Sequence, residues 1–456
     1  MRQSAKNGVV TGTGVREAAT KRSTTARDAL ARLLRSNWRD PDGGAPITVP
    51  AIAVEIERSL SGMEAEVVAP LHLGRRIAVV SDQTTRTVLG HRVESALSRL
   101  STILPIVLDA QSHADAHTVK MLRHSCAAAD ALVAVGLGTI NDLCKYAAAK
   151  DGKPYAVFAT APSMNGYASK NAAITVDGHK QSLPAASPVG VFMDLTVLSA
   201  APARMIRAGL GDSLCRSTAQ ADWLLSHHLL GTPFRVAPFA LLAEDEPGWM
   251  NEPEALLHGD LDAMRALART LVLSGLGMTI CDGSYPASQG EHLISHYVDM
   301  FAPPSRGTYF HGEQVAVATL TMARIQEHVL GAGLPHLQPS SMTCVELQRR
   351  FGFDIGEACW REFEAKRLTQ NAVPNFEARV AETWSDIARD VRNAMISVER
   401  IHDVLKRAGC PTVAADIGLS PEFYATAVRN ARFLRNRYTF LDLADDSGLL
   451  ATVYPT

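Results

Sequence analysis

The pattern of hydrophobic and polar positions along this chain changes its period near residue 200. In the first part, short apolar runs alternate with helical stretches of ten or more residues, which is typical of a parallel sheet with helices on its faces. Strand-like segments are expected at 76–82, 101–109, 130–138 and 154–162. In the second part only helical periodicity remains, and the expected helices are 213–229, 260–281, 311–331, 376–408 and 421–437.

This change of period predicts two domains. Residues 26–200 would form an α/β, Rossmann-like nucleotide domain, and residues 201–456 an all-helical domain. The active site would lie in the cleft between them. Residues 1–25 are polar, Thr-rich and mildly basic, and are expected to form a mobile tail. The apolar run at 270–281 is too short to cross a bilayer, so we expect a buried core helix there.

Composition narrows the class of protein. With 456 residues, 46% of them hydrophobic and 20% charged, the chain can fill two hydrophobic cores. A formal charge of −2 gives no reason to expect nucleic acid or a membrane surface as a partner. The seven cysteines include no CxxC pair, which favours reduced thiols and a cytoplasmic location.

The stretch VAVGLGTINDLCKYA at 133–147 is the first candidate for chemistry. An apolar strand leads into Gly136, Leu137, Gly138 and Thr139, and a helical segment follows. Such a turn leaves backbone N–H groups at a helix N-terminus, where the helix dipole favours a phosphate. The dinucleotide fingerprint requires a third glycine where Asn141 stands, so an ordinary strand–helix turn explains the glycines equally well.

Polar residues after two other predicted strands strengthen the case for a dinucleotide. Asp82 ends the strand 76–82, where a carboxylate can accept hydrogen bonds from an adenosine ribose. The loop TAPSMNGYAS at 160–169 offers the hydroxyl groups of Thr160, Ser163 and Ser169. Small polar loops after successive parallel strands are what a dinucleotide crevice needs.

A second constellation lies in the helical half. Asp212 follows Gly-Leu-Gly at an expected helix start, His292 and His296 stand four residues apart on one helix face, and His311 opens another helix. One carboxylate and two imidazoles suit a catalytic Zn²⁺ or Fe²⁺ site. The spacing alone leaves two alternatives open: the histidines can form an ordinary polar face, and Asp212 can be a helix N-cap.

Taken together, these motifs resemble the sn-glycerol-1-phosphate dehydrogenases. That family belongs to the superfamily of metal-dependent alcohol dehydrogenases, glycerol dehydrogenase and 3-dehydroquinate synthase. The matching stretches occur in the order GLGTINDLCKYAA, TAPSMNGYAS, AGLGDSLCRSTAQADW, EHLISH and HGEQVAVATL. The resemblance covers residues 76–330 and returns at 427–445. It implies interconversion of dihydroxyacetone phosphate and sn-glycerol 1-phosphate with NAD or NADP, in phospholipid metabolism.

The resemblance also implies roles for individual residues. The divalent metal, zinc first with iron or nickel as alternatives, would be held by Asp212, His292 and His311. The substrate would contact His296, Asp212 and residue 165, where the family commonly has aspartate and this chain has Asn165. The dinucleotide would lie against Gly136, Gly138, Thr139, Asn141, Asp142, Thr160, Ser163 and Ser169.

Two further expectations concern charge. A substrate phosphate needs a cation, and Lys180 or Lys170 is a candidate, although a solvated surface lysine is the commoner case. Asp82 favours NAD over NADP, because a carboxylate repels a 2′-phosphate.

Three alternatives remain beside this interpretation. The first is a glycerol or polyol dehydrogenase for an unphosphorylated substrate, and the second is a sugar phosphate cyclase of the dehydroquinate synthase type. The third is an inactive relative that serves as a binding protein, which an intact Asp/His/His set argues against. In the main interpretation the substrate is a small phosphorylated three-carbon compound. The chain is also expected to form a homo-oligomer.

Overall fold

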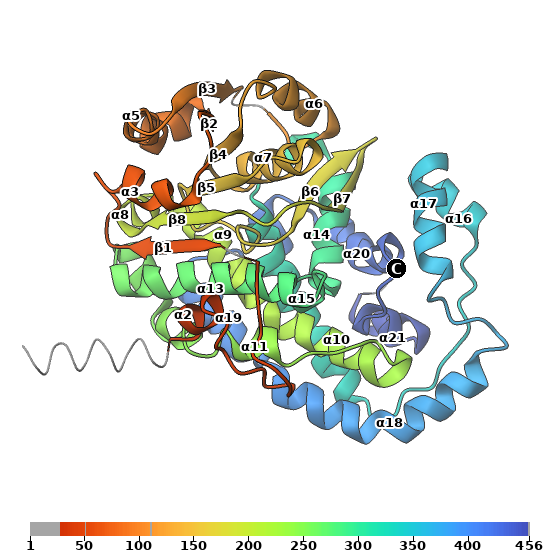
Figure 1. Cartoon of the computed structure of the whole chain (residues 1–456). Helices are drawn as coiled ribbons and strands as arrows, with labels where there is room; N and C mark the ends of the chain where they lie inside the picture. The colour runs from red at the N-terminus through yellow and green to blue at the C-terminus, as the bar shows by residue number, and fades with distance from the viewer. Residues whose placement is uncertain (1–27, 51, 110–111, 455–456) are drawn as a thin grey trace, which may run out of the picture.

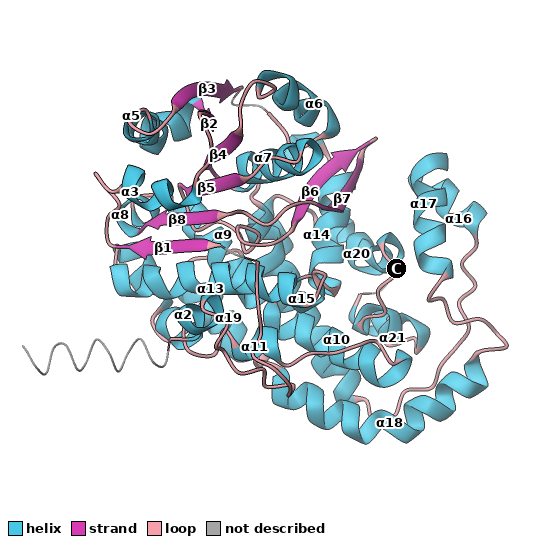
Figure 2. Ribbon diagram, in the orientation of Figure 1, coloured by secondary structure: helices cyan, strands magenta, loops and turns pink. Residues whose placement is uncertain are grey.

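The computed structural model describes residues 28–50, 52–109 and 112–454 (Figure 1). The tail expected at 1–25 lies outside the described residues. An open parallel sheet occupies one part of the molecule and helices fill the other (Figure 2). An α/β part followed by a helical part is what the sequence predicts, so the expected fold class is confirmed.

The sheet has six strands, all paired in parallel, in the order β1-β8-β5-β4-β2-β3. The strands are β1 (Ala53–Glu57), β2 (Arg76–Asp82), β3 (Thr102–Leu108), β4 (Ala131–Gly136), β5 (Tyr155–Ala159) and β8 (Gly190–Asp194). The four predicted strands correspond to β2, β3, β4 and β5. In β4 every residue is buried, because helices cover both faces of the sheet.

Four of the described strands were not predicted from the sequence. Two belong to the main sheet, the edge strand β1 and its neighbour β8. The other two, β6 (Asn171–Val176) and β7 (His179–Pro184), form an antiparallel hairpin. The hairpin stands outside the main sheet and reaches toward α14 (Figure 1). It therefore carries residues of the α/β part to the helical part.

The helices of the α/β part cover the two faces of the sheet. Side chains of α3 and α5 share one apolar cluster with β2 and β4, while those of α6 and α7 belong to the cluster on the opposite face. The helices of this part are α3 (Glu64–Val68), α4 (Gln83–Thr85), α5 (His91–Leu97), α6 (Ala116–Ser125), α7 (Gly138–Asp151) and α8 (Leu195–Ser199), whereas α2 (Ala29–Leu34) lies against the helical part.

The helical part follows β8 and α8. Its helices are α9 (Ala203–Leu214), α10 (Arg216–Leu230), α11 (Ala237–Ala240), α12 (Glu246–Met250), α13 (Leu261–Ile280), α14 (Gly290–Phe301), α15 (His311–Gly331), α16 (Cys344–Phe351), α17 (Phe353–Glu364), α18 (Val373–Ala394), α19 (Val398–Arg407), α20 (Pro421–Asn430), α21 (Phe440–Asp446) and α22 (Leu450–Val453). The helices α16 and α17 lie at the edge of the molecule, at the right of Figure 1.

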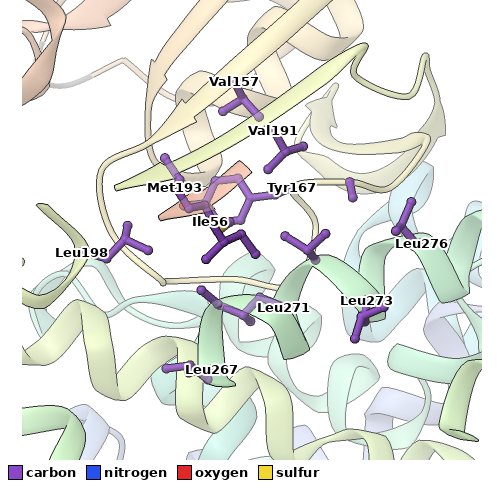
Figure 3. Packing of buried hydrophobic residues seen from close by; sticks show 14 of the residues in the cluster. Ile56, Val157, Tyr167, Val191, Met193, Leu198, Leu267, Leu271, Leu273 and Leu276 are labelled. Carbon is purple, nitrogen blue, oxygen red and sulfur yellow. The ribbon is translucent and has the colours of Figure 1, made fainter. Parts of the chain in front are cut away.

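The helix α13 joins the two parts. Its side chains Leu267 and Leu271 pack beneath Ile56 of β1 and Met193 of β8 (Figure 3). The predicted core helix at 270–281 is thus confirmed as the buried end of α13. No helix among the described residues is long and apolar enough to cross a membrane.

Two expected helices differ from the structure. The run 376–408 is divided into α18 and α19, because Met395 is extended and Ser397 caps the next helix by accepting a hydrogen bond from the backbone N–H of Arg400. The run 421–437 ends as a helix at Asn430, and after a 3₁₀ turn at Ala431–Leu434 the backbone of Arg435 is extended.

Residues 28–50 were expected in the nucleotide domain, but their side-chain hydrogen bonds to other segments are with the helical part. Asp28 binds Arg269 of α13, and Asp42 accepts hydrogen bonds from the backbone N–H groups of Val236 and Ala237. All seven cysteines are free thiols, as expected for a chain without a disulfide framework.

Candidate metal and dinucleotide site

One carboxylate and two imidazoles from three helices meet where the helical part faces the sheet. Asp212 lies on α9, His292 on α14, and His311 is the first residue of α15. One ligand atom from each lies within 4.8 Å of the other two. The Nε2 atom of His292 is 3.7 Å from Oδ1 of Asp212. The structure thus brings together the three residues that the sequence proposed as metal ligands.

The surroundings of Asp212 fit a cation. Its Oδ2 accepts a hydrogen bond of 2.7 Å from the backbone N–H of Asn165. Its Oδ1 has no hydrogen-bond partner among the described residues, although Asp212 is 1% exposed. A buried carboxylate oxygen without a partner is costly. Burial accordingly raises the pKa of Asp212, against the opposing effect of His292. A bound cation would satisfy the orphaned oxygen and restore the ionised form.

The expectation that Asp212 begins a helix is wrong. Asp212 lies in the last turn of α9, which ends at Leu214. The two glycines before it serve helix packing rather than a turn. A Cβ atom on Gly209 would lie 1.5 Å from the carbonyl oxygen of Pro162, and one on Gly211 would lie 2.5 Å from the carbonyl oxygen of Gly312. Glycine therefore lets α9 approach both the 160–169 loop and the start of α15.

The protonation state of His311 also suits a ligand. Burial, helped by the neighbouring His292 and Lys180, lowers the pKa of His311 well below 6.5. The imidazole is therefore neutral near pH 7, which is the form that binds metal.

Glu291 is a functional residue that sequence reasoning missed. Its Oε1 lies 3.0 Å from Nδ1 of His292 and also accepts a hydrogen bond from the backbone N–H of Gln289, while its Oε2 accepts one from Thr218 Oγ1. Because a carboxylate can only accept, Nδ1 of His292 carries the proton and Nε2 is left free on the Asp212 side. Carboxylates orient metal-bound histidines in this way. The signal in the sequence was the acid directly before His292.

A second group that could hold a metal consists of Cys215, Glu291 and His292. It is the weaker choice because burial, together with Glu291 and Asp212, raises the pKa of the Cys215 thiol well above its ordinary value. The thiol also contacts the carbonyl oxygen of Ala287 at 3.5 Å. Metal binding requires the thiolate, which this environment disfavours.

His296 lies beside the ligand cluster, with its ring centroid 6.2 Å from those of His292 and His311. The Nη2 atom of Arg435 is 3.1 Å from its Nδ1. Since arginine can only donate, Nδ1 accepts and the proton of the neutral ring is on Nε2. Burial first, and then Arg435 and Lys180, lower the pKa of His296 well below 6.5. The His296 imidazole is therefore neutral near pH 7.

The expected dinucleotide residues gather at one edge of the sheet. Asp82, Gly136 and Thr160 stand at or directly after the carboxyl ends of the adjacent strands β2, β4 and β5. The helix α7 begins at Gly138, and no side chain of residues 28–50, 52–109 or 112–454 caps its N-terminus. Its first backbone N–H groups are therefore available to an anion.

Several of the expected cofactor side chains are engaged within the protein. The Ser169 hydroxyl contacts Lys145 Nζ at 3.2 Å and donates to backbone carbonyls, and Asn141 donates to Asp142 at 3.1 Å. Asp142 in turn accepts a hydrogen bond from the backbone N–H of Ala173 in β6. Asp82 caps α4 by accepting from the backbone N–H of Thr85. The cofactor roles of these residues, and of Thr139 and Ser163, remain predictions.

The two lysines suggested for a substrate phosphate are both paired. Lys180 on β7 lies 2.5 Å from Asp299 of α14, and Lys170 forms an ion pair with Asp282. Lys180 is close enough to the site to act on His296 and His311. The side-chain Nδ2 of Asn165 is buried next to Asp212, with no hydrogen-bond partner in the part of the chain that the structure describes.

Comparisons with known proteins agree with this geometry. A family model described as iron-containing alcohol dehydrogenase matches residues 55–202. A glycerol-1-phosphate dehydrogenase [NAD(P)+] of Bacillus licheniformis is 28% identical over 411 residues, which cover 89% of this chain and 91% of the relative. One from Halalkalibacterium halodurans is 35% identical over 259 residues, 55% of this chain and 65% of the relative. The chain is thus similar to curated glycerol-1-phosphate dehydrogenases over most of its length, and residues 55–202 match the iron-containing alcohol dehydrogenase model.

Solved structures show the same fold. A probable glycerol dehydrogenase from Sinorhizobium meliloti matches with a TM-score of 0.58 at 19% identity, covering 88% of this chain and 97% of its own. The NADH-dependent butanol dehydrogenase A of Thermotoga maritima matches with a TM-score of 0.60 at 14% identity, covering 92% and 100%. At these identities the likeness shows a shared fold.

Proposed function

We propose that this chain is an NAD(P)-dependent, metal-containing dehydrogenase that interconverts dihydroxyacetone phosphate and sn-glycerol 1-phosphate. The observation that carries the proposal is the Asp212, His292 and His311 cluster, with its orphaned carboxylate oxygen, in a chain similar to glycerol-1-phosphate dehydrogenases. The substrate and the cofactor are those in the names of the curated relatives.

The residues of the cluster have separable tasks. When bound, a divalent ion supplies a Lewis acid for the ketone oxygen, and zinc is proposed first with iron or nickel as alternatives. Glu291 holds His292 so that its Nε2 faces Asp212. His296 keeps its proton on Nε2, because Arg435 occupies Nδ1, and can donate a hydrogen bond to a substrate oxygen from there.

The dinucleotide would place its pyrophosphate on the uncapped N-terminus of α7 at Gly138. Asp82 ends the neighbouring strand β2 and favours NAD over NADP if the adenosine ribose lies beside it. A division into two domains near residue 200, a cytoplasmic location and a homo-oligomeric state belong to the same proposal.

One observation favours a second candidate, a glycerol or polyol dehydrogenase with an unphosphorylated substrate. Both lysines that could meet a substrate phosphate are already paired with carboxylates, Lys180 with Asp299 and Lys170 with Asp282. A paired ammonium group attracts a second anion less strongly.

Oxidation of NADH and NADPH by the metal-loaded protein separates the candidates. Dihydroxyacetone phosphate is compared with dihydroxyacetone, each with and without a chelator. Turnover of the phosphorylated ketone alone, lost with the chelator, supports the proposal, and chiral analysis must then give sn-glycerol 1-phosphate. Turnover of dihydroxyacetone alone refutes it in favour of a polyol dehydrogenase. An absence of steady oxidation with either ketone contradicts both.

A further inference from the structure

Three arginines follow α20 in the segment 431–438, and they differ in their partners. Arg432 is held by the carboxylates of Asp442, Asp445 and Asp446. Arg437 donates to the carbonyl oxygen of Ser288 and to Ser284 Oγ, and it stacks on the ring of Tyr285 at 4.7 Å. Arg435 stands between these two anchored residues.

The side chain of Arg435 makes only one recorded hydrogen bond within the described chain, to Nδ1 of His296 at 3.1 Å. None of the recorded ion pairs of the described residues involves it. The carboxylate of Glu362, which acts on it from a distance, already accepts a hydrogen bond from the backbone N–H of Asn436. A guanidinium group has five N–H donors, so most of those on Arg435 remain available.

This arrangement is unfavourable without an anion. Arg435 is half-buried, and burial together with the neighbouring Arg437 lowers its pKa to about 9. A cation removed from water needs a compensating charge, which no recorded carboxylate supplies at ion-pair distance among the described residues. A planar guanidinium group matches two oxygens of a phosphoryl group, and this is the strongest of its common pairings.

The position of Arg435 also fits a small substrate. It contacts His296, whose ring is 6.2 Å from the rings of the two histidine ligands, and both Arg435 and Lys180 act electrostatically on His296 and His311. In dihydroxyacetone phosphate, three covalent bonds separate the ketone carbon from phosphorus. A ketone at the metal ligands can therefore carry its phosphate toward Arg435.

We propose that Arg435 binds the phosphoryl group of the substrate and so selects phosphorylated over unphosphorylated ketones. The proposal rests on the proposed function for the identity of the reaction, but it assigns the phosphate to a residue other than the two paired lysines.

The test compares two substrates in the Arg435→Gln variant. Loss of charged hydrogen bonds to phosphate should lower kcat/KM for dihydroxyacetone phosphate by about 10- to 150-fold, mainly through KM. Both ketones can lose rate through the contact of Arg435 with His296, but dihydroxyacetone has no phosphate to lose. The ratio of kcat/KM for dihydroxyacetone phosphate to kcat/KM for dihydroxyacetone should therefore fall by at least about tenfold. Arg435→Lys, which keeps the charge but loses the fork, should fall between these results.

Arg437→Gln is the matched control. It removes a neighbouring arginine whose donors are engaged within the protein. The ratio of the two kcat/KM values should stay close to that of the wild type. If Arg437→Gln changes this ratio and Arg435→Gln does not, the assignment is wrong.

Two other outcomes are decisive. An equal loss with both ketones in Arg435→Gln overturns the proposal, because it shows that Arg435 acts only through His296. If the wild type reduces neither ketone, the proposed function fails and titration calorimetry with inorganic phosphate decides the inference. Binding to the metal-loaded wild type that weakens at least tenfold in Arg435→Gln supports an anion site, whereas equal binding or none in both proteins refutes it.

Discussion

Replacement of Gly312 by alanine should disrupt the cluster of the three proposed metal ligands, although Gly312 is not itself a ligand. Gly312 follows His311 at the start of α15 and faces α9, which carries Asp212. A Cβ atom at Gly312 would lie 1.9 Å from the carbonyl oxygen of Ala208, a backbone atom that no rotamer change can move.

The size of the effect follows from this distance. Ordinary van der Waals contact begins at 3.4 Å, so the two helices must separate by about 1.5 Å at this point. Overpacking of this kind typically costs ~1–3 kcal/mol of folding free energy. Metal–ligand distances tolerate only ~0.2 Å, and a displacement of ~1 Å at a catalytic site can cost ~100-fold in rate.

The assay measures bound zinc per chain after dialysis, kcat/KM for the ketone and thermal stability in the same samples. Gly331→Ala is the control, because Gly331 ends the same helix and a Cβ atom there would meet nothing within 4 Å. We expect Gly312→Ala to retain less than about a tenth of the wild-type metal and to lose about 100-fold in kcat/KM. Gly331→Ala should keep both and gain up to ~1 kcal/mol of stability.

Wild-type metal content and activity in a folded Gly312→Ala protein would refute the reasoning. It would mean that the close approach of α9 and α15 does not determine the positions of Asp212 and His311. A protein that fails to fold would instead show that the cost of overpacking has been underestimated, and Gly312→Ser would then fail in the same way.

Three further predictions concern single groups. Glu291→Gln should weaken metal binding by ~10–100-fold, measured by competition with a chromogenic chelator, because the amide no longer fixes the His292 tautomer; unchanged affinity would exclude an orienting role. His296→Asn should keep its metal and lower kcat, and loss of metal would show that His296 is a ligand. In the wild type, kcat/KM should not change near pH 6.5, because burial and Arg435 keep the His296 pKa well below that value and protonation begins only at lower pH. Asn165→Asp should destabilise the apoprotein by ~1–3 kcal/mol in urea unfolding and increase the stabilisation on adding zinc, because it buries a second carboxylate next to Asp212; equal stabilisation in both proteins would contradict this.

The sequence predicts elements well where the pattern is long or continuously apolar. The helix α15 has the predicted limits 311–331, and β2 the predicted limits 76–82. The strand β1 was missed because two of its five residues are glutamates, and β8 because its apolar run, Val191–Met193, is short. The hairpin was missed because β7 is mostly polar and pairs only with β6, outside the main sheet.

Residue types and spacing predict the members of the site better than their surroundings. The three proposed ligands do converge, but Gly209 and Gly211 suggested a turn before Asp212. Their actual role depends on contacts with Pro162 and Gly312, which are far away in the sequence. Arg435 was also missed, because the sequence predicts a helix over 421–437. In the structure this helix ends at Asn430, and the carboxylates of α21 hold Arg432 in the segment that follows.

Metal titration of the apoprotein tests the central claim most directly. Activity with dihydroxyacetone phosphate and NADH or NADPH is measured against added zinc per chain, for the wild type and for Asp212→Asn. The account predicts that wild-type activity rises from near zero and saturates at about one ion per chain, while Asp212→Asn stays inactive at that ratio. Wild-type activity that does not depend on metal, or full activity of Asp212→Asn at one ion per chain, would contradict it.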